Sequence, residues 1–329
     1  MRILSGTESV TRTMRVLVTG GSGYIGGRLC ESLASSEGYS VVSASRSNNY
    51  RPGTDVNVAV IDWRSDESLR ACCSGIDCIV HLAAMNASDC AVSPVAALEI
   101  NTVATARLLQ AAMDAGVRRF LYLSTAHVYG SPLSGRITEA KCPRPRHPYA
   151  TSHRAAEDIV MAASCQGQIE GLVLRLSNAF GRPVSSRVDC WTLLFNDLCR
   201  QAVAGRGLVL RTSGLQRRDF ITMYDVCRAI RHLLEVPWHN SGSGLFNVGG
   251  AWSPTVFEAA TLVADRYAVL TGFQLGIQRQ TPTKDDCAND LFYDIGALTS
   301  TGFHLAGNPI AELDNLLAFC VTEVEKNRV

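Results

Sequence analysis

Residues 15–26 read RVLVTGGSGYIG, an apolar run that turns through glycines into a further apolar segment. In a strand–turn–helix of this kind the helix N-terminus faces an anion, and its free N–H groups bind a dinucleotide pyrophosphate. The glycines allow a tight turn, close approach of backbone to phosphate, and close packing of helix on strand. The segment therefore predicts a dinucleotide site. Its expected residues are Gly20, Gly23, Tyr24, Ile25 and Gly26.

Downstream of this turn, apolar runs and helical patterns alternate through the first half of the chain. The predicted strands are residues 16–19, 40–44, 58–61, 78–82, 119–124 and 171–176. The predicted helices are residues 23–35, 96–115, 149–163, 191–203 and 225–234, with a short strand at 207–211. Continuous apolar strands separated by helices indicate an α/β fold with a Rossmann-type, doubly wound parallel sheet.

We expect three parts along the chain. Residues 1–13 are polar and form a disordered tail, or precede a true start at Met14. Residues 14–180 form the NAD(P)-binding core. Residues 181–329 form mainly a smaller C-terminal substrate-binding lobe, with some segments that return to the core.

Composition excludes several classes of protein. The 329 residues carry a formal net charge of +1, so there is no broad basic field for nucleic acid. The 12 cysteines are scattered and form no CxxC pair, which indicates reduced thiols in a cytoplasmic protein and no metal site. No apolar run is long enough to span a membrane, and the N-terminus lacks a signal-peptide stretch.

The end of the second strand bears on the choice between NAD and NADP. A carboxylate there binds the ribose 2′-hydroxyl of NAD, whereas an arginine accommodates the 2′-phosphate of NADP. Here Ser45 and Arg46 follow the strand and no acid is in reach, which favours NADP(H). In the alternative interpretation Arg46 is a solvated loop charge. Asp62, after the third strand, is the expected partner of the adenine amino group.

Two further segments carry the expected chemistry: residues 122–130, YLSTAHVYG, and residues 148–157, PYATSHRAAE. With these, the chain resembles the extended short-chain dehydrogenase/reductases, in the nucleotide-sugar epimerase, dehydratase and reductase branch. The resemblance runs from residue 15 to about residue 303. Its other landmarks are residues 81–84 (HLAA), 101–105 (NTVAT), 175–181 (RLSNAFG), 216–221 (QRRDFI) and 246–250 (FNVGG).

The resemblance implies a catalytic group made of a hydroxyl residue, a tyrosine and a lysine. Thr125 holds the hydroxyl position with Ser124 beside it, and Tyr149 is the acid or base. The lysine position holds His153, on the same helix face as Tyr149, and the resemblance implies that both residues also bind the cofactor. A free phenol has a pKa of about 10, so a neighbouring cation is needed for it to ionise near neutral pH. We expect His153 to substitute for lysine, with a tyrosinate keeping it protonated; the alternative is a dinucleotide-binding protein with a degenerate site.

The remaining site residues also follow from the resemblance. Leu82, Ala83, Ala84 and Asn101 are expected along the cofactor, Asn101 through hydrogen bonds to backbone or water behind the site. Asn178 and Arg218 are expected at the phosphates of a nucleotide-sugar substrate, where a guanidinium binds bidentately. His127 is a candidate substrate-side acid or base.

The sequence leaves two kinds of redox reaction open. The dehydratase branch has an Asp-Glu pair where this chain has Ala126 and His127, which argues against dehydration. An NADP(H) preference favours a reductase or dehydrogenase acting on a nucleotide-activated sugar. The general resemblance favours an epimerase that retains NAD. It also implies a homodimer formed through the helices at 96–115 and 149–163.

Overall fold

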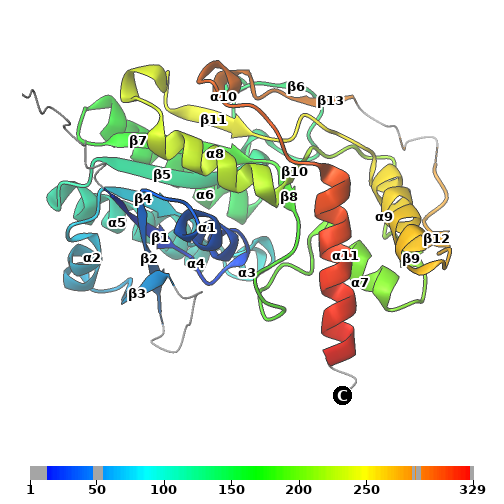
Figure 1. Ribbon diagram of the computed structural model, residues 1–329. Coiled ribbons are helices and arrows are strands. Elements are labelled where there is room, and N and C mark those ends of the chain that lie inside the picture. Colours follow the sequence, from blue (N-terminus) through cyan, green and yellow to red (C-terminus); the bar gives the residue numbers. More distant parts are fainter. Residues whose placement is uncertain (1–12, 47–54, 284–285, 287–289, 327–329) are drawn as a thin grey trace, which may run out of the picture.

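The computed structural model describes residues 13–46, 55–283, 286 and 290–326. The predicted tail at 1–13 lies outside these residues except for Thr13. At the centre is a parallel seven-stranded sheet of order β11-β7-β5-β4-β1-β2-β3 (Figure 1). Its strands are β1 (Met14–Thr19), β2 (Tyr39–Ser45), β3 (Val56–Val60), β4 (Cys78–His81), β5 (Arg119–Thr125), β7 (Glu170–Leu176) and β11 (Leu245–Val248).

The strand order reverses between β1 and β4. From β1 the chain moves outward through β2 to β3, then crosses back to β4 and continues outward in the other direction. In such sheets a ligand binds at the carboxyl ends of the two strands that flank the reversal. The six predicted core strands are confirmed, each end within two residues. β11 was not predicted, because its four residues lie far along the chain between glycines.

Helices cover both faces of the sheet, so its strands are apolar on both sides (Figure 1). On one face α1 (Tyr24–Ala34) and α8 (Met223–Glu235) pack against each other and the sheet through residues such as Leu29 and Ile230. On the other face lie α2 (Asp66–Cys73), α5 (Ala104–Asp114) and α6 (Pro148–Cys165). Two later segments join this core: β11 adds the edge strand beside β7, and α8 covers one face of the sheet.

The helix predicted over 96–115 is not one regular helix. It begins earlier, as α4 (Pro94–Leu98), passes through a π-helical turn at Glu99–Val103 and continues as α5. The π turn buries the amide of Asn101, which accepts a hydrogen bond from Met85 N and donates one to Ser152 Oγ on α6. Such turns occur frequently at functional sites. Here the turn ties the long helix to α6.

A separate apolar cluster lies between α7 (Leu194–Val203), α9 (Val256–Thr271) and α11 (Pro309–Lys326). Phe180, Phe195 and Phe220 stack around Trp252 at its centre. The predicted helix at 191–203 begins only at Leu194. Trp191 precedes it and packs against Phe319, with the guanidinium of Arg200 over its ring.

Short elements join these layers. Three two-stranded parallel sheets pair β8 (Asn178–Phe180) with β10 (Phe220–Thr222), β9 (Leu208–Val209) with β12 (Ile277–Gln278), and β6 (Gly135–Ile137) with β13 (Leu291–Tyr293). The other helices within the described residues are α3 (Ala87–Val92), α10 (Gly296–Ser300) and 3-10 turns at Ala126–Tyr129 and Trp238–Asn240. The strand predicted over 207–211 is thus only two residues long, because it pairs with the equally short β12.

Two expectations from composition can be compared with the fold. The eleven cysteines in the described part of the chain are all free, and only Cys142 and Cys165 are exposed. Within the same residues no helix is long and apolar enough to cross a bilayer.

Candidate active site

The glycine-rich turn after β1 admits no larger side chain at two positions. Gly20 has a φ of +70°, and a Cβ there would lie 2.9 Å from the backbone N of Ala83. A Cβ on Gly26 would lie 2.2 Å from the carbonyl oxygen of Gly20. Gly23 N–H donates to Gly20 O over 2.8 Å and leads into α1, whose first amides point out of the turn. This narrow cradle fits a dinucleotide pyrophosphate.

The two other predicted residues of the turn contribute differently. The hydroxyl of Tyr24 donates to Gly181 O (2.7 Å) and lies 3.3 Å from Asn196 Oδ1, so the side chain ties α1 to the loop after β8. Ile25 is partly buried against the core. Only the backbone amides of these two residues remain available to a ligand in the turn.

The end of β4 is held by a chain of hydroxyls around His81. Thr19 Oγ1 accepts from Leu82 N and Ala83 N, so its own hydrogen goes to His81 Nδ1, 2.6 Å away. His81 Nε2 then donates to Thr105 Oγ1 (2.8 Å). Burial lowers the pKa of His81 to about 3, so the ring is neutral. The network fixes the backbone at residues 82–83 beside the glycine turn, while Ala84 is exposed.

The residues predicted to contact the adenosine part of the cofactor follow β2 and β3, on the side of β1 opposite β4. Ser45 ends β2 and is buried, and Arg46 follows it and is exposed. The loop that continues from Arg46, residues 47–54, lies outside the described residues. Asp62 is exposed after β3, and its Oδ1 accepts from Arg64 N.

Tyr149, the predicted acid or base, lies where β5 meets α6. α6 begins sharply because Pro148 occupies its first turn and His147 Nδ1 accepts from Tyr149 N. Tyr149 is partly buried and hydrogen-bonds to the Thr125 side chain at the end of β5. Burial nevertheless raises the pKa of Tyr149 to about 12, so the phenol holds its proton at neutral pH.

His153 lies one turn along α6 from Tyr149, with their ring centroids 4.5 Å apart. It is 2% exposed, and its Nδ1 lies 2.7 Å from the hydroxyl of Tyr122 on β5. Burial, and then the charge of His127, lower the pKa of His153 to about 3. The protonated His153 expected from the sequence is therefore not the favoured form, because the ring is removed from water.

Ser124, predicted as a catalytic neighbour of Thr125, points elsewhere. Its hydroxyl donates to Glu157 Oε1 over 2.5 Å, inside the contact between β5 and α6. Glu157 and Arg175 form a buried ion pair of 2.7 Å, with side chains 0% and 1% exposed. Successive strand residues alternate in direction, so Ser124 faces the helix as Tyr122 does. We therefore treat Ser124 as a structural residue.

Tyr122 and Glu157 were not among the predicted site residues. Tyr122 contacts His153 and Ser124 contacts Glu157, so positions i and i+2 of a strand meet positions i and i+4 of a helix. These two periods are a sequence signal for such pairs, but it can be read only once β5 and α6 are known to pack together.

Three residues were predicted to contact the substrate: His127, Arg218 and Asn178. His127 is exposed, with its ring 6.5 Å from that of Tyr149; desolvation by surrounding atoms, and then the positive charge of Arg218, lower its pKa. Arg218 is exposed and forms no ion pair within the part of the chain that the structure describes. Arg217, its neighbour, pairs with Glu258 at 3.4 Å. Asn178 donates from Nδ2 to Asp219 O, which holds the loop that carries Arg218.

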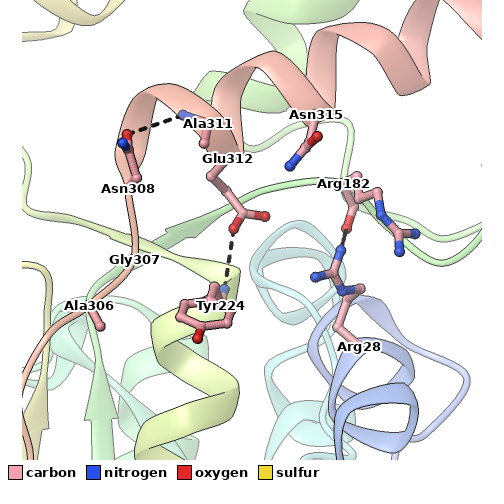
Figure 2. A pocket seen from close by; sticks show the side chains of 9 residues that line it. All are labelled: Arg28, Arg182, Tyr224, Ala306, Gly307, Asn308, Ala311, Glu312 and Asn315. Atoms are coloured by element: carbon pink, nitrogen blue, oxygen red, sulfur yellow. Dashed lines mark hydrogen bonds between the residues drawn. The ribbon is translucent and has the colours of Figure 1, made fainter. Parts of the chain in front are cut away.

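A cavity of 410 Å³ opens at another place, between α1, α8 and α11. Figure 2 shows Arg28 on α1 donating to the backbone of Arg182, and Glu312 on α11 accepting from Tyr224 N. None of the predicted site residues lines this cavity. Among the described residues, no group of three or more His, Cys, Asp or Glu side chains could hold a metal ion.

Comparisons with known proteins show which family the chain resembles. The model of the "NAD dependent epimerase/dehydratase family" matches residues 16–249. A dTDP-D-glucose 4,6-dehydratase of Mus musculus is 30% identical over 264 residues, covering 75% of this chain and 71% of that protein. An uncharacterized UDP-glucose epimerase of Bacillus subtilis is 26% identical over 271 residues, covering 77% and 82%.

Among solved structures, MoeE5 in complex with UDP-glucose and NAD is similar to this chain, with a TM-score of 0.78 and 26% identity. The alignment covers 94% of this chain and 99% of MoeE5. The family match spans the glycine turn, Tyr149 and Arg218. The chain therefore belongs to the NAD-dependent epimerase/dehydratase family of extended short-chain dehydrogenase/reductases.

Proposed function

We propose that this chain is an NADPH-dependent reductase of a keto-sugar carried on a nucleoside diphosphate. The observation that carries the proposal is the state of Tyr149: its pKa is raised to about 12, and its neighbour His153 is neutral. A phenol that keeps its proton can donate it to a carbonyl oxygen. The reverse reaction needs a tyrosinate to accept a proton from an alcohol, and a neutral imidazole does little to stabilise one.

When bound, the reduced nicotinamide supplies a hydride to the carbonyl carbon. Tyr149 gives its phenolic proton to the carbonyl oxygen, which becomes the product hydroxyl, and the tyrosinate then regains a proton from solvent. Thr125, which hydrogen-bonds to Tyr149, orients the phenol and the substrate oxygen. Asn101 holds α6 in place through Ser152.

The preference for NADPH is supported by the end of β2. Residues 43–46 read SASR, without a carboxylate, and the exposed Arg46 directly follows the last residue of the strand. Arg46→Ala is expected to weaken NADPH binding at least tenfold and to leave NADH binding unchanged, because only NADPH carries the 2′-phosphate. Arg70→Ala, an exposed arginine on α2, is the matched control.

The nucleotide part of the substrate is assigned to Arg218, supported by Asn178, with His127 beside the sugar. Arg218 has no carboxylate partner among the described residues, so its guanidinium is available to a diphosphate. UDP-sugars are the first substrates to test, since MoeE5 is solved with UDP-glucose and the Bacillus relative is named as a UDP-glucose epimerase.

An epimerase that retains NAD is the second candidate, and the names of the relatives favour it. Such an enzyme uses one tyrosine first as base and then as acid, and the raised pKa of Tyr149 disfavours the base step. Dehydration is not proposed, because Ala126 and His127 stand where the dehydratase branch has two carboxyls.

The deciding experiment has two steps. Purified protein is denatured and any released dinucleotide is identified by mass spectrometry. The protein is then assayed for NADPH oxidation with UDP- and dTDP-linked 4-keto sugars, with Tyr149→Phe as the inactive control. An empty site that oxidises NADPH supports the reductase. Retained NAD with sugar interconversion supports the epimerase, and dinucleotide binding without turnover supports a degenerate site.

We also propose a homodimer. The helices α3 and α4 and the π turn carry exposed apolar side chains: Val92, Val95, Leu98, Ile100 and Val103. Several adjacent exposed apolar residues are typical of an interaction surface. Because these helices pack on α6 through Asn101 and Thr102, a dimer formed there would stiffen the wall of the active site.

A further inference from the structure

The buried pair of Tyr122 and His153 has a direction that the rest of the hydrogen bonding determines. Tyr122 Oη and His153 Nδ1 are 2.7 Å apart, and both side chains are 2% exposed. Among the described residues, His153 is the only hydrogen-bond partner that the structure gives to the Tyr122 hydroxyl. If Nδ1 were the donor, the phenolic hydrogen would be buried without an acceptor. Tyr122 therefore donates to Nδ1, which leaves the ring proton of neutral His153 on Nε2.

The other nitrogen of His153 is unsatisfied. Nε2 is buried and has no hydrogen-bond partner within the described part of the chain. Leaving a buried N–H unpaired costs free energy, so a ligand oxygen that accepts from it gains affinity. The ring lies against Tyr149, so such an oxygen would be on the ligand held beside the phenol.

We propose that Tyr122 is a positioning residue, whose hydroxyl holds His153 as the Nε2–H tautomer. In this tautomer the neutral ring donates a hydrogen bond from Nε2 to a hydroxyl oxygen of the dinucleotide bound beside Tyr149. The proposal rests on the proposed function only for the identity of that ligand. It explains how histidine replaces lysine here: the hydrogen bond is retained and the positive charge is not.

The first test reads the tautomer without any activity. Protein with ¹⁵N-labelled histidine is examined by NMR, with His153→Gln used to assign the signals. We expect His153 in the wild type to show a protonated Nε2 and an unprotonated Nδ1. In Tyr122→Phe the donor to Nδ1 is lost, and the two nitrogens should shift toward an average of both tautomers. A wild-type His153 with its proton on Nδ1 overturns the proposal.

The second test measures NADPH and NADH binding by calorimetry. Tyr122→Phe should weaken binding about fivefold to tenfold, the loss of one hydrogen bond. Tyr293→Phe removes another buried phenol, which donates to Arg175 O, and should leave binding unchanged. In the His153→Lys background, Tyr122→Phe should have no effect, since an ammonium has no tautomer to hold.

The outcomes separate this proposal from the proposed function. If Tyr122→Phe weakens binding only in the presence of His153, the positioning role stands, even when no keto-sugar is reduced. If Tyr122→Phe weakens binding equally in both backgrounds, or in neither, the role is overturned. Melting temperatures of all variants show that each one is folded at the assay temperature.

Discussion

Individual residues of this active site are held by partners that lie far away in the chain. His81 is flanked by two threonine hydroxyls and His153 by a tyrosine hydroxyl. Removing an imidazole from water disfavours its charged form, and burial is the first cause of the lowered pKa of both rings. Both neutral histidines lie beside the Tyr122 ring. The hydrogen-bond donors of this site are therefore uncharged, whereas a site with a lysine would have a charged donor.

These histidines make the fold sensitive to acid. Their pKa is about 3 in the folded protein and 6.5 in the ordinary case, so the unfolded chain binds protons first as the pH falls. Above a pH of about 6.5 both rings are neutral in the folded and the unfolded chain, so they do not lower the stability. As the pH falls from there toward about 3, the free energy of unfolding decreases by about 1.4 kcal/mol per pH unit for each ring. Urea unfolding at several pH values should show this slope. His153→Gln should reduce this slope by the share of one histidine, and a slope unaffected by His153→Gln would contradict the assignment.

The buried ion pair between Glu157 and Arg175 gives a second residue-scale prediction. Glu157→Gln leaves the guanidinium buried and uncompensated, which is expected to lower the free energy of unfolding by about 3–5 kcal/mol. Glu323→Gln breaks the pair with Lys326 near the surface and should have a much smaller effect, because water screens that pair. Denaturant unfolding of both variants measures the difference. Equal losses would mean that the buried pair is not the stronger constraint.

At the scale of elements, the contact between β1 and α1 decides the geometry of the dinucleotide site. The helix approaches so closely that Gly26 has no room for a methyl group. On the opposite side of the site, the π turn at Glu99–Val103 lets Asn101 reach both residues 85 and 152. The position of α1 thus depends on the missing side chain of Gly26, and the position of the long helix depends on the hydrogen bonds of Asn101.

Gly26→Ala should therefore displace α1 from the turn. The added methyl would lie 2.2 Å from Gly20 O, and overpacking of this kind costs about 1–3 kcal/mol. We expect a lower melting temperature and at least a tenfold loss of dinucleotide affinity by calorimetry. At Gly276 a Cβ would meet no atom within 4 Å, so Gly276→Ala is the matched control. Unchanged dinucleotide affinity in Gly26→Ala would count against this turn as the pyrophosphate site.

At the scale of the whole molecule, the proposed active site lies between the central sheet and the loops that the second half of the chain contributes. β10 pairs with β8 so that Phe220, two residues after Arg218, lies beside Asn178. Asp219 holds the loop after β11 by accepting from Gly250 N and Trp252 N. The carboxyl of Asp219 is buried, and burial raises its pKa to about 6. The sugar side of the site thus depends on contacts between distant segments.

The proposed dimer is tested at this scale. Val95→Glu together with Val103→Glu places two charges on the apolar surface of α4 and the π turn, where the side chains are 69% and 52% exposed. We expect the protein to become monomeric by analytical ultracentrifugation. Val269→Glu on α9, at a site 68% exposed, is the control and should not change the mass. A wild type that is already monomeric would contradict the dimer.

The sequence by itself determined six strands of the central sheet and the glycine turn, because these depend on short-range patterns. Apolar runs of four to seven residues identify buried strands, and the glycine spacing identifies the turn wherever the chain places it. It also placed Tyr149 and His153 on one helix face. These features need no knowledge of which strand lies beside which.

Only the tertiary structure decided what these residues touch. Tyr122 and Ser124 point toward α6, which lies far from β5 in the sequence. Arg217 pairs with the distant Glu258, whereas Arg218 has no ion-pair partner within the described residues. β11 returns to the sheet beside β7, also from a distant part of the chain. The low pKa of His153 has the same origin, because water is excluded by β5 and α6 together. Long-range packing sets burial, and burial decides whether this histidine carries a charge.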